Sequence, residues 1–251
     1  MSLIKQTSYV GKGTVFVQLR GVAGAKMVPI GNCEELNTNV EVDQKTLLDY
    51  SSSGGGALET LDRIKSVKVQ MKVTNLSPAN IAIALRASVT SSASAAVADE
   101  AHADIALGSL IRLERLPDLT APITLKKGAT VIPSAGNWTA IGAGIWPSPE
   151  ATGLLDGDDI TVSYTALASD MLQTLVQSAN EYRLIFSGMN EAREDKPTVA
   201  TMHRLKFAPA SLGLITDDFG RLQLDAELLS DPTVVGTGLS KFMLIEMAQA
   251  A

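Results

Sequence analysis

Hydrophobic and polar residues alternate with a period of two along three segments of the chain. This pattern is typical of β-strands that bury one face and wet the other. In residues 66–74, for example, Val67, Val69 and Met71 share the apolar face. The polar positions of the three segments are Glu35, Asn37, Asn39, Glu41 and Asp43 in residues 35–43, Lys68, Gln70 and Lys72 in residues 66–74, and Gln223, Asp225 and Glu227 in residues 221–229.

Other segments predict further strands and one helix. The helix is expected to start at Ser77, a good N-cap, with Pro78 at its first position, and to end near Arg86. The additional strands are expected at residues 13–19, 45–50, 110–116, 129–132, 159–165, 181–188, 198–207 and 241–247. These elements together predict a mainly β fold.

Two stretches of small residues divide the chain. A run of serines and glycines cannot lie inside a strand or helix and predicts a flexible loop made of Ser51, Ser52, Ser53, Gly54, Gly55 and Gly56. Residues 87–98 are almost entirely Ala, Ser, Val and Thr and are expected to be a pliable connector. Short strand-like pieces then alternate with Pro and Gly up to residue 165, which predicts a small β insertion. We therefore expect one domain made of residues 1–86 and 166–251, interrupted by residues 87–165.

Composition and charge exclude several classes of protein. Hydrophobic residues make up 45% of the 251, enough for a core, and the net charge of −6 gives no basic surface to hold nucleic acid. The start of the chain lacks the apolar region of a signal peptide, and no apolar run is long enough for a membrane helix. We expect a protein made in a cytosol, without membrane insertion.

The residues that usually carry chemistry are sparse. With the single Cys33 and only two histidines, His102 and His203, we expect no disulfide, metal or cofactor. His102 is expected in an exposed loop and His203 in a strand, and Glu34 beside Cys33 would disfavour a thiolate. No catalytic motif is present, so we do not expect an enzyme.

Nine short segments, in this order along the chain, carry a resemblance to a known family. They are VPIGN (28–32), LDY (48–50), IKSV (64–67), LSPAN (76–80), ITVSY (160–164), FSGMN (186–190), MHRLKF (202–207), DDFG (217–220) and LSDP (229–232). Together they resemble the major tail tube protein of long-tailed, non-contractile bacteriophages. The similarity spans roughly residues 10–247 and is weakest between 87 and 160.

This resemblance implies a β-sandwich or barrel with a flanking helix, and a structural role. Members of that family form hexameric rings that stack into a hollow tube for genome delivery. It implies assembly in the host bacterial cytoplasm into a virion tail, with tape measure, terminator and distal tip proteins as partners, and DNA passing without specific binding. The eleven polar positions of the alternating segments would then line the channel, and the loop from Ser51 to Gly56 would contact the next ring.

Two other functions stay open. A β-sandwich adhesion module that binds carbohydrate or protein would use Trp138 and Trp146, because indole rings stack on sugars and anchor interfaces. A hydrolase would need an acid and base pair such as Asp217 and Asp218.

Overall fold

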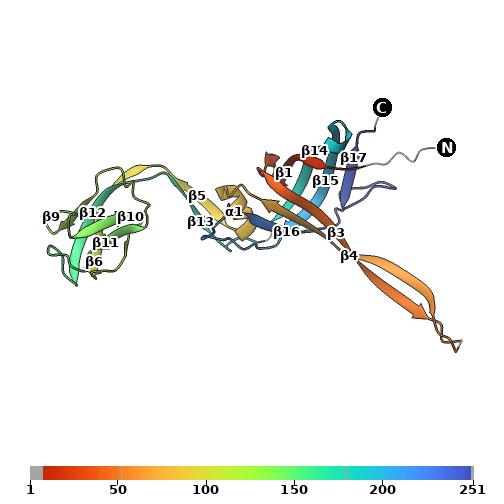
Figure 1. The fold of residues 1–251 in the computed structure, drawn as a ribbon, viewed down its shortest axis with the longest axis horizontal. Coiled ribbons are helices and arrows are strands. Elements are labelled where there is room, and N and C mark those ends of the chain that lie inside the picture. Colours follow the sequence, from red (N-terminus) through yellow and green to blue (C-terminus); the bar gives the residue numbers. More distant parts are fainter. Residues whose placement is uncertain (1–7, 52, 179, 250–251) are drawn as a thin grey trace. The chain divides into compact units, whose positions relative to one another are not determined.

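The computed structural model describes residues 8–51, 53–178 and 180–249 as two compact units. Unit 1 contains residues up to 88 together with residues from 172 onward, and unit 2 contains residues 89–171 (Figure 1). Both boundaries fall a few residues later than the sequence predicted. These described residues are mainly β with one α-helix, as the sequence predicted.

Unit 1 is built on one antiparallel sheet with the strand order β2-β1-β14-β15-β16-β4-β3, in which β17 also pairs with β15. Its strands are β1 (Gly11–Leu19), β2 (Val28–Pro29), β3 (Cys33–Leu48), β4 (Ala57–Val73), β14 (Glu181–Asn190), β15 (Lys196–Phe207), β16 (Leu222–Leu228) and β17 (Met243–Met247). A short 3-10 helix, Glu191–Arg193, joins β14 to β15.

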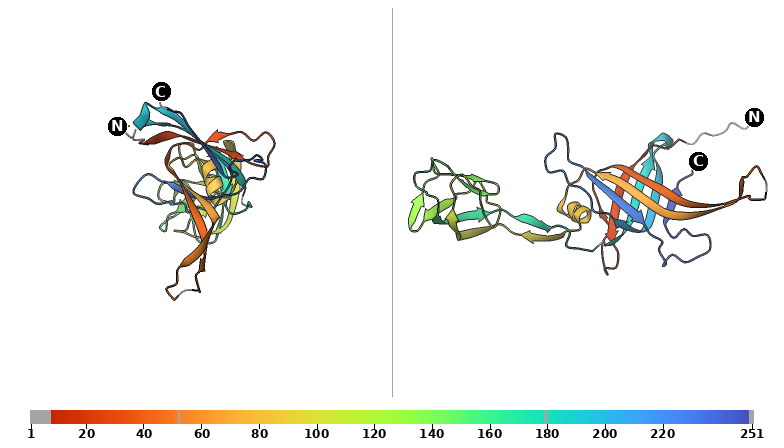
Figure 2. Two further views of the ribbon diagram at one scale, coloured as in Figure 1. Left: turned by 90° about the vertical axis from the view of Figure 1, so that its right-hand side faces the viewer. Right: turned by 90° about the horizontal axis from the view of Figure 1, so that it is seen from below.

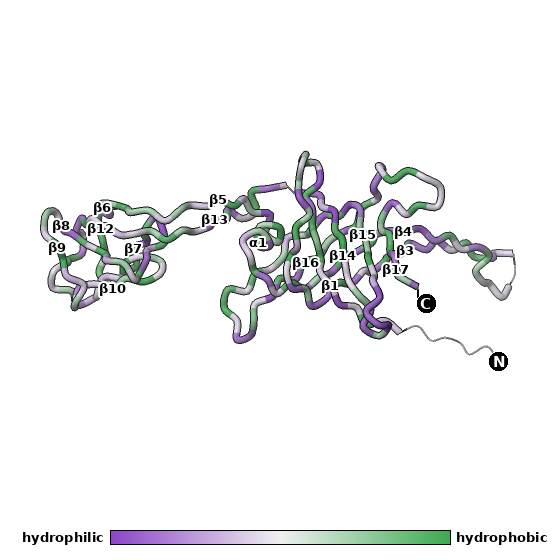
Figure 3. The backbone as a smooth tube through the Cα atoms, turned by 90° about the horizontal axis from the view of Figure 1, so that it is seen from above, coloured by the Kyte–Doolittle hydropathy of each residue, from purple (hydrophilic) through white to green (hydrophobic). Residues whose placement is uncertain are grey.

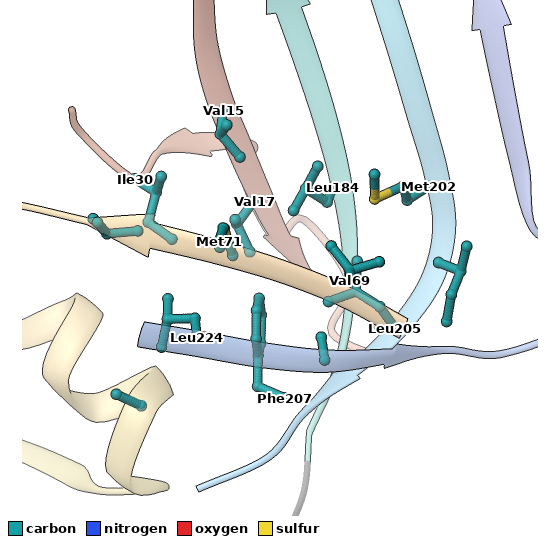
Figure 4. Close-up of a cluster of buried hydrophobic side chains, with 14 of the residues drawn as sticks. Val15, Val17, Ile30, Val69, Met71, Leu184, Met202, Leu205, Phe207 and Leu224 are labelled. Atoms are coloured by element: carbon teal, nitrogen blue, oxygen red, sulfur yellow. The ribbon is translucent and has the colours of Figure 1, made fainter. Parts of the chain in front are cut away.

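The sheet of unit 1 divides at β15 and folds over its own core. Residues 205–207 of β15 pair with β16, whereas residues 198–202 pair with β17. As a result β16 and β4 cross over β1, β14 and β15, and the side chains of Met71 and Leu224 lie opposite Val17 and Leu184 (Figure 4). The core therefore lies between two layers of a single sheet.

The strand boundaries correct the prediction at one hairpin. The segments expected at 35–43 and 45–50 form a single strand, β3, and its partner β4 begins at Ala57 rather than at residue 66. Both strands extend beyond the core as a two-stranded ribbon (Figure 2). Its positions carry a mixture of apolar and polar side chains, so the alternation that marks the core segments is lost there (Figure 3).

The helix α1 (Pro78–Leu85) begins and ends where the sequence indicates. The Ser77 side chain accepts a hydrogen bond from the Asn80 amide at 3.3 Å, and Arg86 ends the helix in a left-handed conformation with φ 49°. The buried Asn80 side chain donates to the Ile30 and Asn75 carbonyls at 2.7 Å, which joins the helix to the approach to β3. Within the described residues, no helix is long and apolar enough to cross a membrane.

Unit 2 has its own strands and its own core. The strands are β5 (Ser88–Ser92), β6 (Ala95–Ile105), β7 (Ile111–Arg112), β8 (Thr124–Lys127), β9 (Thr130–Ile132), β10 (Trp138–Ile141), β11 (Gly144–Pro147), β12 (Asp158–Ala166) and β13 (Ser169–Gln173). They form a β6-β12-β8-β9 sheet and a β10-β11-β7 sheet around buried Leu113, Leu125 and Ile145. The chain enters and leaves through the paired strands β5 and β13.

The prediction that residues 87–98 form a pliable connector was wrong. These small residues form β5 and the start of β6, because Ala95, Ala96 and Val97 find antiparallel partners on β12. Conversely, the strand expected at 110–116 is reduced to β7, two residues long. Small side chains in this region therefore accompany strand pairing, and not the flexible connector that the sequence predicted.

A buried ion pair fixes the end of β1 to the segment that follows β16. Arg20 donates to the carboxylate of Asp231, which is 2% exposed, and to the His203 carbonyl. Burial alone would raise the pKa of Asp231, but the donors on Arg20 and Thr233 outweigh it and hold that pKa well below its usual range. The charged carboxylate is therefore the form that stabilises the fold.

This pair predicts a loss of stability in acid. Because the folded-state pKa of Asp231 is depressed, its contribution is present above the unfolded pKa, near 3.8, and is lost as the pH falls below it. Asp231→Asn should lower the free energy of unfolding at pH 7 by about 3 kcal/mol, since Arg20 loses its charged partner and keeps the His203 carbonyl. Denaturant unfolding at pH 7 and pH 3 measures both effects. A difference between wild type and variant that is the same at the two pH values would contradict this account.

Candidate functional site

The three alternating segments come together on one face of unit 1. They form β3, β4 and β16, which are neighbours in the sheet, and their polar residues face the same side. We call this surface the polar face. Its cross-strand rows are Glu35, Lys72 and Gln223; Asn37, Gln70 and Asp225; Asn39, Lys68 and Glu227; and Glu41 opposite Ser66. Ten of the eleven residues picked out by alternation therefore lie together.

The remaining residue, Asp43, lies beyond a bulge in the pairing of β3 with β4. The register shifts after Glu41, and Asp43 pairs with Arg63 in the ribbon that leaves the core. Alternation within a single strand gives no sign of a bulge on its partner, so the sequence could not separate Asp43 from the others.

The lysines of the polar face are paired with glutamates. Lys68 forms an ion pair with Glu41, which also accepts from the Ser66 hydroxyl at 2.9 Å. The Lys68 hydrogen bond, followed by that from Ser66, holds the pKa of Glu41 below its usual value, and Glu41 raises the pKa of Lys68. Lys72 lies 3.4 Å from Glu35. These pairs are exposed, so they neutralise charge and add little stability.

The acidic character of the polar face therefore comes from β16. Among the described residues, the donors to Asp225 are side-chain amides, those of Gln70 at 3.3 Å and Gln223 at 3.2 Å. Glu227 stands beside Lys68, whose amine is already paired with Glu41. Arg221, at the start of β16, pairs with Glu34 and Asp218 instead. The result is a hydrated face with a small negative excess along one strand.

The opposite side of β3 is apolar and partly uncovered. Val40 is 52% exposed and Val42 53%, whereas Val69 and Met71 on the neighbouring strand are fully buried. The edge strand β17, which pairs with β15 alone, shows the same feature, with Ile245 54% and Met247 52% exposed. Between these two edges lies a groove of about 860 Å³ with a mainly apolar lining from β1, β3, β14, β15 and β17. The sequence did not reveal it, because it depends on β17 pairing with β15.

The ribbon formed by residues 42–64, which we call the arm, continues the apolar edge of β3. All of the described side chains along its two strands are exposed. Its large exposed apolar and aromatic residues are Val42, Leu47, Leu48, Tyr50, Leu58, Leu61 and Ile64. The loop predicted at Ser51 to Gly56 forms its tip, closed by a hydrogen bond from the Asp49 amide to the Gly56 carbonyl at 2.8 Å, and Ser52 lies outside the described residues. A two-stranded ribbon alone is only marginally stable in water, so the arm depends on the sheet that its strands continue.

The structure gives little support to catalytic chemistry at the residues considered from sequence. Cys33 is half-buried, and burial raises the pKa of its thiol, which disfavours the thiolate. Asp217 and Asp218 lie in an exposed loop, where the Phe219 amide and Arg221 lower the pKa of Asp218. That direction is opposite to the one a general acid requires. Among the described residues, no cluster of His, Cys, Asp and Glu is placed to hold a metal ion.

One histidine expectation was wrong. His102 is not in a loop but in β6, where its Nε2 atom lies 3.1 Å from Glu100. Glu100 also accepts from the Tyr164 hydroxyl at 2.7 Å. Burial and this hydrogen bond raise the pKa of Tyr164 to about 12, so the phenol stays neutral and holds β12 to β6. His203 lies in β15, as expected.

The two tryptophans of unit 2 have different environments. Trp138 belongs to the core at 8% exposure and donates its indole N–H to the Ile132 carbonyl at 3.0 Å. Trp146 is 40% exposed, on the opposite side of the same hairpin. Of the pair proposed as contacts for a binding module, only Trp146 is available to a ligand.

Two positions on β4, Lys68 and Met71, test which face of the strand is exposed and which is buried. Met71→Ala should lower the free energy of unfolding by about 2–5 kcal/mol, because it leaves a cavity in the core. Lys68→Ala should change it far less, since the ion pair with Glu41 is exposed and screened by solvent. Denaturant unfolding of both variants measures the contrast, and equal losses would contradict it.

Comparison with known proteins places the chain in a family without assigning it an activity. No curated protein matches the sequence. A family model described as "Protein of unknown function UCP028589" matches residues 8–246. That match covers most of the chain and includes every strand of the polar face, and the chain therefore belongs to this family.

Proposed function

We propose that this chain is a structural subunit of a phage tail tube, which assembles into stacked hexameric rings around a channel for genome delivery. The observation that carries the proposal is the pairing, in one unit, of a hydrated polar face with uncovered apolar edges at β3 and β17. A tube subunit needs both properties, a wet wall toward the channel and apolar surfaces toward other copies.

The polar face suits a channel through which DNA slides. A wall that binds phosphate tightly would do so through unpaired lysines and arginines, each of which adds salt-dependent affinity. Here Lys68 and Lys72 are paired with glutamates, and Asp225 and Glu227 leave a small negative excess. Such a surface repels the DNA phosphates weakly and offers them no fixed binding position.

The edges of the sheet suit assembly from identical copies. β3 and β17 are different surfaces, so a contact between β3 of one copy and β17 of the next is head-to-tail. Contacts of that kind close into rings or extend into filaments, depending on the rotation between copies. Exposed strand edges also pair readily with another chain, which would bury Val40, Val42, Ile245 and Met247.

Electron microscopy of the purified protein across a concentration series, with its solution mass, tests the proposal. Rings or hollow tubes of uniform width are the expected result, alone or after addition of a tail-tip initiator. A protein that stays monomeric under both conditions would contradict it. If that monomer also bound a glycan array through Trp146, the adhesion-module alternative would take its place.

The charge of the channel wall gives a second prediction. Asp225→Lys combined with Glu227→Lys should leave assembly intact but slow DNA release from particles by about tenfold or more, because unpaired amines would hold phosphates. The matched control is Glu150→Lys with Glu194→Lys, which makes the same charge change at exposed positions off this face. Release kinetics at two salt concentrations measure the effect. Equal kinetics for the two variants would place Asp225 and Glu227 outside the channel.

The arm gives a third prediction. Deletion of residues 51–56 should leave a folded subunit that fails to polymerise, since the arm tip would no longer reach its partner. Replacing the same residues with a shuffled Ser/Gly sequence of equal length is the control and should restore assembly. Circular dichroism checks the fold and electron microscopy counts the tubes. Tubes of normal length from the deletion would refute a stacking role for this loop.

A further inference from the structure

The β10-β11-β7 sheet of unit 2 buries one face and leaves the other exposed. The row formed by Ala140, Ile145 and Ile111 belongs to the core of this unit. Because side chains alternate along a strand, the neighbouring positions point the other way. We call that side the outer face, and its large exposed side chains include Trp146 and Ile141. The surfaces described for unit 1 do not include it, so it has no role assigned above.

The central strand of the outer face carries Trp146 beside a position without a side chain. Thr139 pairs with Trp146 across the sheet. Two residues earlier, Gly144 lies between Ile141 on one side and Arg112 on the other. A Cβ atom at Gly144 would lie 2.1 Å from a carbonyl oxygen of β7, so this position accepts only glycine. The backbone is therefore bare next to the tryptophan, and a flat ligand can approach both.

The polar groups of the outer face have no partners within the described residues. The indole N–H of Trp146 donates to none of them, in contrast to that of Trp138, which is bonded to a carbonyl. The ion pairs in the described part of unit 2 do not include Arg112, which is exposed. β7, β10 and β11 contain no other charged residue, so the face is positive in a chain whose net charge is −6.

These groups define the chemistry of a ligand. A guanidinium and an indole N–H are donors only, so the ligand has to supply acceptors. The positive charge of Arg112 favours a carboxylate, which a guanidinium can bind through two parallel hydrogen bonds. The exposed indole ring of Trp146 favours a flat apolar surface against it, such as the C–H face of a sugar ring. An acidic sugar combines these three features.

The size of the outer face matches a saccharide and not a protein. β10 and β11 are four residues long, which is about 14 Å, and three paired strands span about 10 Å. The area is therefore on the order of 150 Å². A stable protein interface covers about 800 Å² on each partner. A short saccharide, in contrast, can be held by one aromatic ring and a few polar groups.

We infer that the outer face of the β10-β11-β7 sheet binds an acidic saccharide. Its sugar ring stacks on Trp146 and lies over the bare backbone at Gly144, and its carboxylate pairs with Arg112. The site goes beyond the proposed tail-tube function. It is made by unit 2 alone, so it does not depend on assembly.

Equilibrium dialysis of the full-length protein against labelled oligosaccharides tests this site, because the method serves a monomer and an assembled tube alike. The panel consists of oligomers of galacturonate, glucuronate, mannuronate and sialate, each with its methyl ester, which keeps the sugar and removes its charge. At least one acidic oligomer should bind, and its ester should bind at least tenfold more weakly. No binding by any acidic oligomer, or equal binding of acid and ester, would overturn the inference.

Variants locate the site. Trp146→Ala should weaken binding at least tenfold, and Arg112→Gln should abolish the preference for acid over ester. The matched control, Arg63→Gln, makes the same charge change on the arm and should keep both properties. Buried Trp138 is the remaining tryptophan of Trp146→Ala, so a blue-shifted fluorescence maximum there shows that unit 2 is folded. Unchanged affinity in Trp146→Ala, or an unchanged preference in Arg112→Gln, would refute the assignment.

Two comparisons separate this inference from its alternatives. Polyglutamate carries carboxylates without sugar rings, and binding as strong as that of the acidic oligosaccharide would assign the face to an acidic peptide instead. Trp146→Ala and Arg112→Gln should assemble like the wild type. A protein that binds an acidic oligosaccharide but never forms rings or tubes would support this site and reject the tube, whereas tubes that bind no member of the panel would do the reverse.

Discussion

The incomplete cover over the inner face of the unit 1 sheet constrains the rest of its structure. β15 pairs with β16 at one end and with β17 at the other, so the sheet divides and leaves β3 and β17 as separate free edges. The groove between them is lined by Leu36 of β3 and by the half-exposed Ile245 and Met247 of β17, and the half-exposed Val40 and Val42 lie farther along β3. The described residues leave these surfaces partly exposed, and under the proposed function they would be buried against other copies.

The polar face arises from three strands of the same sheet, β3, β4 and β16. Because side chains alternate along β3, β4 and β16, burying Val69, Met71 and Leu224 necessarily gathers the intervening polar residues on one side. The charges there are largely paired across strands, with Lys68 against Glu41 and Lys72 against Glu35. One sheet thus carries a hydrated surface with paired charges and a partly exposed apolar surface, the combination on which the proposed function rests.

The sequence predicted what depends on local pattern. Alternation identified β4 and β16 and ten residues of the polar face, and the cap formed by Ser77 and Pro78 identified α1. It could not predict what depends on partners distant in the chain. The bulge that moves Asp43 into the arm, the strand character of residues 88–98 and the groove closed by β17 all arise from pairing across long separations. Leu47, Leu58 and Leu61 gave no alternating signal because the arm has no core to face.

Amide hydrogen exchange at low and high protein concentration tests the central claim most directly. If β3 and β17 meet other copies of the chain, the amides of residues 36–42 and 243–247 should become protected as concentration rises, while those of β12 in the unit 2 core should exchange at unchanged rates. Exchange at β3 and β17 that is independent of concentration, in a sample whose mass shows association, would contradict the claim that these edges form the interface.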